Sequence, residues 1–467
     1  MSAAPNANKQ EYRKTMMLTE PVWKIIPKMA IPTIVAFVIN SVYSLADTYF
    51  VSSLGEAATA AVSVNSSLDQ LIMMCGSMLA VGANSYIARL LGAKEEKKAS
   101  VVLSVAFFLA AIFGIVILAC GTAFMTPMVR LLGSTPTCEQ YAIDYATYVL
   151  LVAPFMTTSF VMNQCLRAEG SAMLSMIGMG FGGVLNCFLD PVFINGFGSF
   201  EGMGVAGASL ATAISKLVSF GILLFPYITR HSMLRISLKL FKPAWEILRQ
   251  IVSVGSSSML RSGLAVVSAI VLNNIAGDIS DSVLAGIGVT TKIMMFPFSI
   301  ILGFGNGFQP VAGFNWGAKR YDRVRQSYSF AAKVAVIGSL VMAVALWFGA
   351  DFVIGLFGEN EPELVRIGAL CIRTQCLALP IHAWVALVNM LCSGLGRAGG
   401  ALLLSTSRQG TCFLPIVFPM AHFFGADGIA SVQAVADVLT LFMAVPMIIS
   451  VMREIRRREQ ALQEAPQ

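Results

Sequence analysis

Charged residues are scarce in this chain, and their scarcity excludes an ordinary soluble fold. Only 12% of the 467 residues are Asp, Glu, Lys or Arg, whereas 56% are hydrophobic and the mean hydropathy is +0.75. Soluble domains carry roughly 25% charged residues, so most of this chain must lie against lipid or against other apolar helices. We therefore expect an all-α integral membrane protein.

Residues that carry chemistry are also few. There are three histidines, and the nine cysteines lie mostly within hydrophobic stretches, without the spacing of a metal site or a disulfide framework. We find no nucleotide-binding loop and no nucleophile with a base partner, so we expect no catalytic residue, no metal and no cofactor. The first twenty residues are polar, and the first hydrophobic stretch is too long for a cleavable signal peptide.

Twelve hydrophobic stretches are long enough to cross about 30 Å of hydrocarbon as helices. A linker at 229–248 divides them into two lobes of six helices each, residues 1–228 and 249–467, around a central cavity. Residues 1–14 and 459–467 are expected to be short disordered tails. The stretches lie at 29–51, 59–86, 99–121, 141–165, 171–195, 205–228, 249–275, 284–312, 327–350, 365–393, 399–422 and 428–452.

The loop charges predict the orientation in the membrane. Lys and Arg gather in the tails, the linker and the connections near Lys94 and Lys319, which all fall on one side of this topology. The other connections are mainly acidic, with Arg130 as the clearest exception. Because positive loops stay in the cytoplasm, both termini are expected there, in a bacterial cytoplasmic or inner membrane. The net charge of +7 then reflects topology, and no nucleic acid partner is expected.

One phrase occurs twice, about 225 residues apart. Residues 82–94 read GANSYIARLLGAK and residues 307–319 read GFQPVAGFNWGAK; further pairs include CFL at 187–189 and 412–414, and Gly204 with Gly428. Two parallel copies of a six-span unit are typical of a transporter whose site lies between its halves. The repeat fails at one position, because Asp190 has no counterpart between Leu414 and Pro415.

Two acids inside the first-lobe spans are candidate functional residues. Asp47 shares a helix face with Tyr43 and Asn40, and Asp190 stands one turn after Asn186. Both acids lie at a similar depth, where two carboxylates can share a proton or hold a small cation. A buried charge is costly in hydrocarbon unless it has a role, although either acid could also be an interfacial residue near a helix end. We favour a functional role for both acids.

Four motifs occur in a characteristic order and spacing, namely LADTYFVSSLG at 45–55, the two Gly-Ala-Lys repeats, CLRAEG at 165–170 and LNCFLDP at 185–191. Through them the chain resembles the multidrug and toxic compound extrusion (MATE) family, in its DinF-like prokaryotic branch. The resemblance covers about residues 20–455. It implies an antiporter in which Asp47, Asn186 and Asp190 couple cation entry to drug exit, with Asn40 and Asn163 as contributors.

The second lobe departs from a related pattern. The sodium-coupled NorM-like branch places further acids in spans seven and ten, where this chain has Arg261 and Arg373. The resemblance therefore favours coupling in the first lobe. Tyr43, Arg261, Met294 and Arg373 are predicted to line the substrate cavity, although methionines can equally fill core positions. Arg408 and Asp437 are expected to form a structural ion pair.

These observations predict a multidrug efflux antiporter that exports amphipathic, mainly cationic drugs or dyes by alternating access. The coupling ion is expected to be H⁺, with Na⁺ at Asp47 and Asp190 as the alternative. The other partner is the lipid bilayer, and a monomer is expected. An alternative function is a flippase for a lipid-linked oligosaccharide or a cell-wall precursor. A channel would more plausibly need a continuous polar ring, which these few polar groups do not form.

Overall fold

A computed structural model describes residues 4–52, 54–132, 134, 136–197, 200–355 and 362–464. Nearly all of these residues are helical, apart from short connections and a small antiparallel hairpin of β1 (Gly196–Phe197) and β2 (Phe200–Glu201). Eleven of the helical stretches are long and apolar enough to cross a membrane. The expectation of an all-α, multi-pass membrane protein is confirmed.

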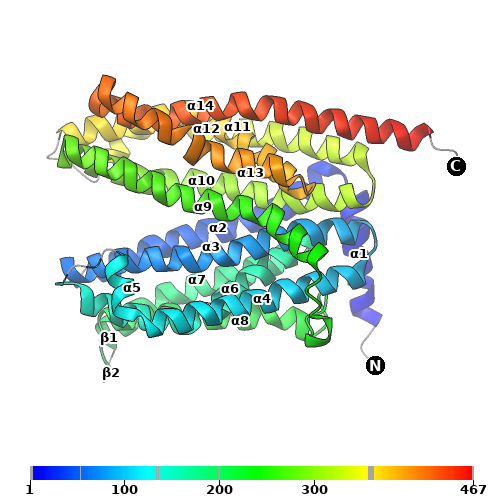
Figure 1. Cartoon of the computed structure of the whole chain (residues 1–467), viewed down its shortest axis with the longest axis horizontal. Coiled ribbons are helices and arrows are strands. Elements are labelled where there is room, and N and C mark those ends of the chain that lie inside the picture. The colour runs from blue at the N-terminus through cyan, green and yellow to red at the C-terminus, as the bar shows by residue number, and fades with distance from the viewer. Residues whose placement is uncertain are drawn as a thin grey trace.

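The helices form two bundles that lie side by side (Figure 1). The first bundle contains α2 (Val22–Ser52), α3 (Glu56–Gly92), α4 (Glu96–Ala123), α5 (Met125–Leu131), α6 (Glu139–Ala168), α7 (Ala172–Asn195) and α8 (Val205–Ile228). A connection with a 3-10 turn, η1 (Leu238–Leu240), leads to α9 (Trp245–Ile279), α10 (Asp281–Gly317), α11 (Tyr321–Gly355), α12 (Pro362–Gly394), α13 (Ala398–Thr406), a π-helical turn η2 (Ser407–Thr411) and α14 (Phe413–Glu464). Most predicted spans fall inside single helices, which often continue beyond the predicted ends, whereas the span 399–422 runs through α13, η2 and the start of α14.

The last helical stretch contains two crossings. It runs for 67 residues from Ala398 to Glu464, or about 100 Å at 1.5 Å per residue, which is far more than one crossing needs. Gly425 interrupts it with φ 56° and ψ −132°, a conformation that residues with a side chain rarely adopt. The chain reverses at this glycine, so the part of the chain that the structure describes contains twelve segments long enough to cross a membrane.

The sequence repeat is also a repeat of backbone conformation. Lys94 and Lys319, which follow the two long helices α3 and α10, both adopt the left-handed region, with φ of 64° and 57°. Gly170 and Gly396 do the same after α6 and α12, with φ of 80° and 77°. Left-handed residues end helices and start a new chain direction. The two copies therefore end the corresponding helices in the same way.

The structure corrects the repeat in one place. Gly204, before α8, has φ 58° and ψ −130°, which matches Gly425 and not Gly428. Gly207 and Gly428 also correspond, because a methyl group on either would lie about 2 Å from a main-chain carbonyl oxygen, 2.2 Å and 2.1 Å respectively. The sequence alignment of Gly204 with Gly428 was wrong by three residues, since Gly-x-x-Gly occurs in both copies.

The bundles touch closely at the end of the molecule that holds the connections 93–95, 229–244 and 318–320, which we call the basic end. A methyl group on Gly82 of α3 would lie 2.0 Å from the carbonyl oxygen of Ile251 in α9. One on Gly255 of α9 would lie 1.9 Å from the carbonyl oxygen of Met78 in α3. Backbones approach this closely only where no side chain intervenes. Glycine contacts thus join the lobes near the basic end.

The amino-terminal segment was predicted to be a disordered tail, and this was wrong. Residues Ala4–Thr19 form a helix, α1, that crosses the basic end (Figure 1). Met17 is fully buried, and its carbonyl accepts a hydrogen bond from Asn315 of the second lobe at 3.2 Å. Arg13 donates to the carbonyl of His231, in the connection after α8, at 3.1 Å. On the first lobe, a methyl group on Gly170 would lie 3.5 Å from the side chains of Met16 and Met17. This helix therefore contacts both lobes.

Candidate functional site

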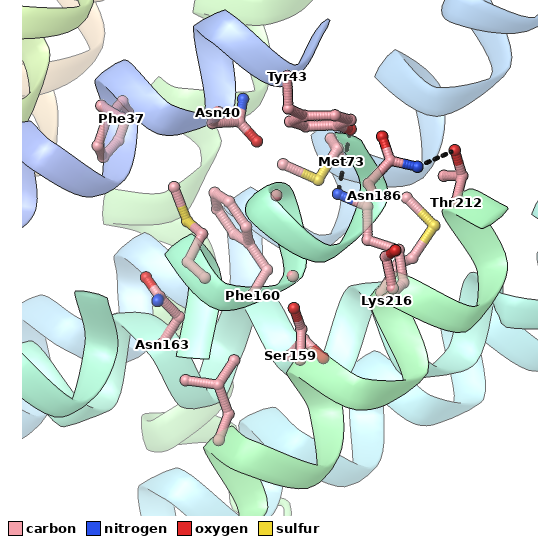
Figure 2. A pocket seen from close by; sticks show the side chains of 17 residues that line it. Phe37, Asn40, Tyr43, Met73, Ser159, Phe160, Asn163, Asn186, Thr212 and Lys216 are labelled. Atoms are coloured by element: carbon pink, nitrogen blue, oxygen red, sulfur yellow. Dashed lines mark hydrogen bonds between the residues drawn. The ribbon is translucent and has the colours of Figure 1, made fainter. Parts of the chain in front are cut away.

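A cavity of about 890 Å³, including its part open to solvent, lies within the first lobe. We call it the first cavity. Helices α2, α3, α6, α7 and α8 form its walls, and Figure 2 shows aromatic, methionine and amide side chains that point into it. Such a mixture suits a flat, apolar ligand with a few polar groups. The lining includes Phe37, Asn40, Tyr43, Met73, Met156, Phe160, Asn163, Met179, Asn186, Thr212 and Lys216.

Lys216 is the charged residue that lines this cavity. Its ammonium lies 3.3 Å from the hydroxyl of Tyr43 and 4.9 Å from the centre of the same ring (Figure 2). Tyr43 comes from α2 and Lys216 from α8, so the contact joins two helices across the cavity. The positive charge is held by a cation–π contact and by nearby acids. Lys216 falls within the predicted span 205–228, but no pattern in the sequence indicated a role for it.

Asp190 lies behind the cavity wall and is completely buried. Asn186, one turn earlier on α7, donates from Nδ2 to Asp190 Oδ1 at 3.0 Å and to Thr212 Oγ1 at 3.2 Å. The other carboxylate oxygen, Oδ2, is buried and has no hydrogen-bond partner. Buried polar atoms are almost always paired, so an unpaired carboxylate oxygen indicates a place for a proton or a cation.

Asp47 is close enough to Asp190 for their charges to interact, and it lies beside a third acid, Asp69 of α3. The hydroxyl of Tyr145 donates to Asp47 Oδ2 at 3.5 Å, whereas Oδ1 of Asp47 is buried without a partner. We call Asp47, Asp69, Asp190 and Lys216 the acidic cluster. Three carboxylates stand against one ammonium, so the cluster can carry up to two excess negative charges. Such an excess attracts protons or other cations.

A second cavity, of about 800 Å³, lies between the lobes. It adjoins the first cavity, because Phe37, Met73 and Phe160 line both. Arg261 of α9, which was predicted to line a substrate cavity, lies in the wall of this cavity. The remaining lining is rich in amides and hydroxyls, namely Gln70, Ser77, Gln164, Ser257, Ser258, Ser262, Asn306, Gln309, Asn389, Ser393 and Ser405.

The structure brings most of the predicted site residues together. Asp47, Asn186 and Asp190 meet in the acidic cluster or beside it, and Asn40 and Tyr43 line the first cavity. Asn163 also lines it, but its side chain donates to the carbonyl of Ser175 at 3.0 Å and accepts a hydrogen bond from Arg167. Its contacts thus hold α6 to α7 and do not extend to the acids.

Two predicted cavity residues lie elsewhere, and both assignments are corrected. Met294 is 1% exposed and packs in the core of the second lobe, because the same apolar side chain suits a core as well as a cavity. Arg373 pairs with Asp351 of the preceding helix at 2.5 Å, at a largely exposed position. Neither residue lines the first or the second cavity.

The predicted pair of Arg408 and Asp437 is confirmed. Arg408 Nε lies 2.6 Å from Asp437 Oδ1, with Asp437 buried. Arg408 belongs to the π-helical turn η2, a distortion that is common at functional positions. His382 lies 4.0 Å from the same carboxylate, as a buried polar contact. The second lobe therefore has a neutralised charge pair, whereas the first lobe has an excess of acid.

The contact between Gln164 and Asn306 was missed. Gln164 of α6 accepts from Asn84 at 2.8 Å and donates to Asn306 of α10 at 3.3 Å, which links the lobes through amides. Amides occur throughout membrane helices, so no sequence signal singles out these three. Asp69 carried a signal, as an acid within a span, but Lys216, whose charge acts on it, is 147 residues away (216 minus 69).

Comparison with known proteins gives consistent results. The chain matches the MatE family model at residues 32–192 and 258–417, one segment in each lobe. It is 26% identical over 437 residues to the multidrug export protein MepA of Staphylococcus aureus (strain MSSA476), covering 93% of this chain and 95% of that protein.

Two solved structures have the same fold. One is an outward-facing conformation of a multidrug resistance MATE family transporter of the MOP superfamily, with a TM-score of 0.87, 25% identity and coverage of 97% and 99% of the two chains. The other is a MOP superfamily transporter from Pyrococcus furiosus, whose binding pocket of reverse polarity is said to suggest a different function. It has a TM-score of 0.86 at 25% identity, with the same coverage.

Proposed function

The chain belongs to the MatE family, and from this premise we propose that it exports amphipathic, mainly cationic drugs or dyes across the bacterial cytoplasmic membrane in exchange for protons. It is a transporter and not an enzyme. The observation that carries the proposal is the acidic cluster beside the first cavity, where Asp190 Oδ2 and Asp47 Oδ1 are buried without partners. An apolar cavity next to an excess of negative charge suits a lipophilic cation.

In the proposed exchange, the same carboxylates attract the cationic drug and bind the proton that displaces it. With the acids ionised, a cationic drug in the first cavity is stabilised by their field. When a proton binds Asp190 or Asp47, that attraction is lost and the drug is released. Asn186 supports both states, because its amide can donate to a carboxylate and accept from a protonated acid. Pro191 follows Asp190 directly and interrupts the hydrogen bonds of α7 at this point, so the helix can bend there.

We further propose that the basic end faces the cytoplasm. The support is the concentration of Lys and Arg at this end. The glycine contacts that join the lobes lie there too, and the chain shares its fold with an outward-facing transporter. In this orientation the conformation is closed toward the cytoplasm, and a proton would enter from outside.

The test is transport by the purified protein in liposomes. A cationic dye is placed on one side, and a proton gradient or a sodium gradient is imposed separately. We expect the proton gradient to drive dye against its concentration gradient and the sodium gradient at constant pH to do so much less. Dye movement driven by sodium alone would overturn proton coupling. Absence of movement under either gradient, with the protein shown to be folded and inserted, would contradict drug export.

A flippase for a lipid-linked oligosaccharide or a cell-wall precursor is the second candidate. The observation that favours it is Arg261 in the second cavity, since a guanidinium binds phosphate well. The relative with reversed pocket polarity shows that this fold accommodates different pockets. Translocation of a fluorescent lipid-linked phosphate in the same liposomes, without dye export, would favour this candidate.

A further inference from the structure

Arg261 is a positive charge without a carboxylate partner. Within the described part of the chain its guanidinium has one recorded hydrogen-bond contact, with the Ser258 hydroxyl at 3.4 Å, and it forms no ion pair. A guanidinium has five N–H donors, so most of its bonding capacity is unused at the wall of the second cavity. Such a charge is costly within a membrane unless something compensates it. Arg408, whose charge acts on Arg261, is already paired with Asp437.

Gln309 gives an independent indication at the same cavity. Its side chain is 1% exposed, and both its amide nitrogen and its amide oxygen are buried without a hydrogen-bond partner. Gln309 lines the second cavity from α10, whereas Arg261 lines it from α9. Unpaired amides at buried positions are rare in folded proteins, and an unsatisfied donor that faces a cavity usually has a ligand or water to bind. Two unsatisfied donor groups thus line the same cavity from two helices.

The repeat places these charges in a simple pattern. Gly307 faces Ala30 as Gly82 faces Ile251, so α2 and α9 correspond at an offset of 221 (251 minus 30). At this offset, Arg261 of the second lobe replaces Asn40 of the first. The same offset relates Gly204 to Gly425. At this offset, Asp437 of the second lobe occupies the position that Lys216 has in the first. The two lobes share a scaffold but differ in charge: acid is in excess by the first cavity and guanidinium by the second.

We infer that Arg261 and Gln309 form a binding site for the carboxylate of amphipathic substrates, in the second cavity. The two cavities adjoin at Phe37, Met73 and Phe160, so one ligand can reach both. Its apolar body lies in the first cavity, and its carboxylate accepts two hydrogen bonds from Arg261 and one from Gln309. A cationic group on the same molecule faces the acidic cluster. This inference deepens the proposed function by naming a substrate class for the export cavity.

The test compares a xanthene dye that carries a free carboxylate with its methyl ester, a pair that differs only in that group. Fluorescence polarisation gives the Kd of both dyes for the purified protein in phosphatidylcholine nanodiscs. We expect the wild type to bind the acid about tenfold more tightly than the ester, as one charge-assisted bond suggests. In Arg261→Gln the preference is expected to disappear while ester binding is unchanged, which also shows that the variant is folded.

Two further variants keep the inference testable if Arg261→Gln does not fold. Arg261→Lys retains the charge but loses the two-pronged geometry, so part of the preference should remain. Gln309→Leu should also reduce the preference and leave the ester unaffected. Arg373→Ala is the matched control, since this arginine lies outside both cavities. An equal loss of affinity for both dyes, or no preference in the wild type, would overturn the inference.

A lipid phosphate is the other anion that could reach this site. Phosphatidylglycerol is therefore added to the nanodiscs, and the acid preference is expected to persist. If phosphatidylglycerol abolishes the preference in the wild type, the site belongs to a lipid headgroup and the carboxylate assignment is wrong. Export of the ester is measured in parallel; its failure would contradict the proposed function, whereas the binding comparison needs no gradient and still decides the assignment of Arg261.

Discussion

Gly92 and Gly317, the glycines of the two Gly-Ala-Lys repeats, face each other's helices across the lobe interface. A methyl group on Gly92 would lie 1.9 Å from the carbonyl oxygen of Phe314, and one on Gly317 would lie 1.9 Å from that of Arg89. The contact is reciprocal, as a two-fold pseudo-symmetry requires. The repeated phrase in the sequence is thus the place where the two copies meet.

Gly92→Ala and Gly317→Ala should each weaken closure at the basic end. The added methyl group must push the two backbones apart, at a cost of about 1–3 kcal/mol for overpacking. We expect a longer distance between spin labels at Lys97 and Gln326, both exposed on opposite lobes, measured in a cysteine-free background. Gly221→Ala and Gly338→Ala are the controls, because a methyl group there meets no atom within 4 Å. An unchanged distance in both interface variants would show that these glycines do not control closure.

Asp190→Asn should abolish proton-driven export. The amide mimics the protonated acid in shape but cannot exchange a proton, so binding and release are uncoupled from the gradient. We expect export in liposomes to fall at least about tenfold, and Asp47→Asn to behave similarly, because these acids act on one another. Asp278→Asn, at an exposed position, should transport normally. Full proton-driven export by Asp190→Asn would remove this acid from the coupling mechanism.

Glu169 should make thermal stability depend on pH. This residue follows α6 at the basic end, where burial raises the pKa of its carboxyl to about 7, despite the opposing effects of Arg13 and of a hydrogen bond from Ser232. The folded state then binds the proton more tightly than the unfolded state, whose pKa is near 4.5. Stability should therefore fall as the pH rises from about 4.5 to about 7, by on the order of 3 kcal/mol.

The measurement is the Tm of the purified protein between pH 5 and pH 8. Glu169→Gln cannot ionise, so its Tm should decline less with pH than that of the wild type, and the difference between the two curves isolates this carboxyl. Glu11→Gln is an exposed control on α1. Parallel curves for the wild type and Glu169→Gln would show that this carboxyl does not titrate in the range.

The two arginine–aspartate pairs of the second lobe should respond differently to mutation. Arg408→Ala leaves buried Asp437 without its partner and should destabilise the protein by about 3–5 kcal/mol. Arg373→Ala breaks an exposed pair with Asp351 and should cost less than about 1 kcal/mol, with substrate preference unchanged. Thermal unfolding and a panel of exported dyes give both readings. A changed dye preference in Arg373→Ala would return this residue to the substrate path.

Much of the architecture followed from the sequence because lipid imposes a strong signal on it. Long apolar stretches fix the spans, and the repeat fixes their division into corresponding elements. The first-lobe acids were found for the same reason: Asp47 and Asp190 are rare residues in such stretches, and Asn186 is one helical turn from Asp190.

What was missed depends on contacts that leave no local pattern. Arg373 and Arg261 are both arginines within predicted spans of the second lobe, so the sequence gives them the same signal. Only the structure shows that Arg373 pairs with Asp351 of the preceding helix, whereas Arg261 lines a cavity. Met294 is an apolar residue within a span, and such residues occur in both cores and cavities. The fold of α1 was missed because its sequence is mostly polar and its partners are distant in the sequence. Its side chains make most of the contacts, through Gln10, Arg13 and the buried Met17, and the carbonyl of Met17 adds one more.

The position of α1 has a practical consequence for work with this protein. Arg323 of the second lobe donates to the carbonyl of Glu20 at 2.6 Å, just after α1, while Gln10 within α1 donates to the carbonyl of Ser232 at 2.9 Å. Ser232 in turn donates to Glu169 of the first lobe at 2.8 Å, so separating the lobes at the basic end would strain this chain of hydrogen bonds. A purification tag or fluorescent fusion at the amino terminus would lie next to α1 and could disturb these contacts. The end of α14 lies away from α1 (Figure 1). Fusions belong at the carboxyl terminus.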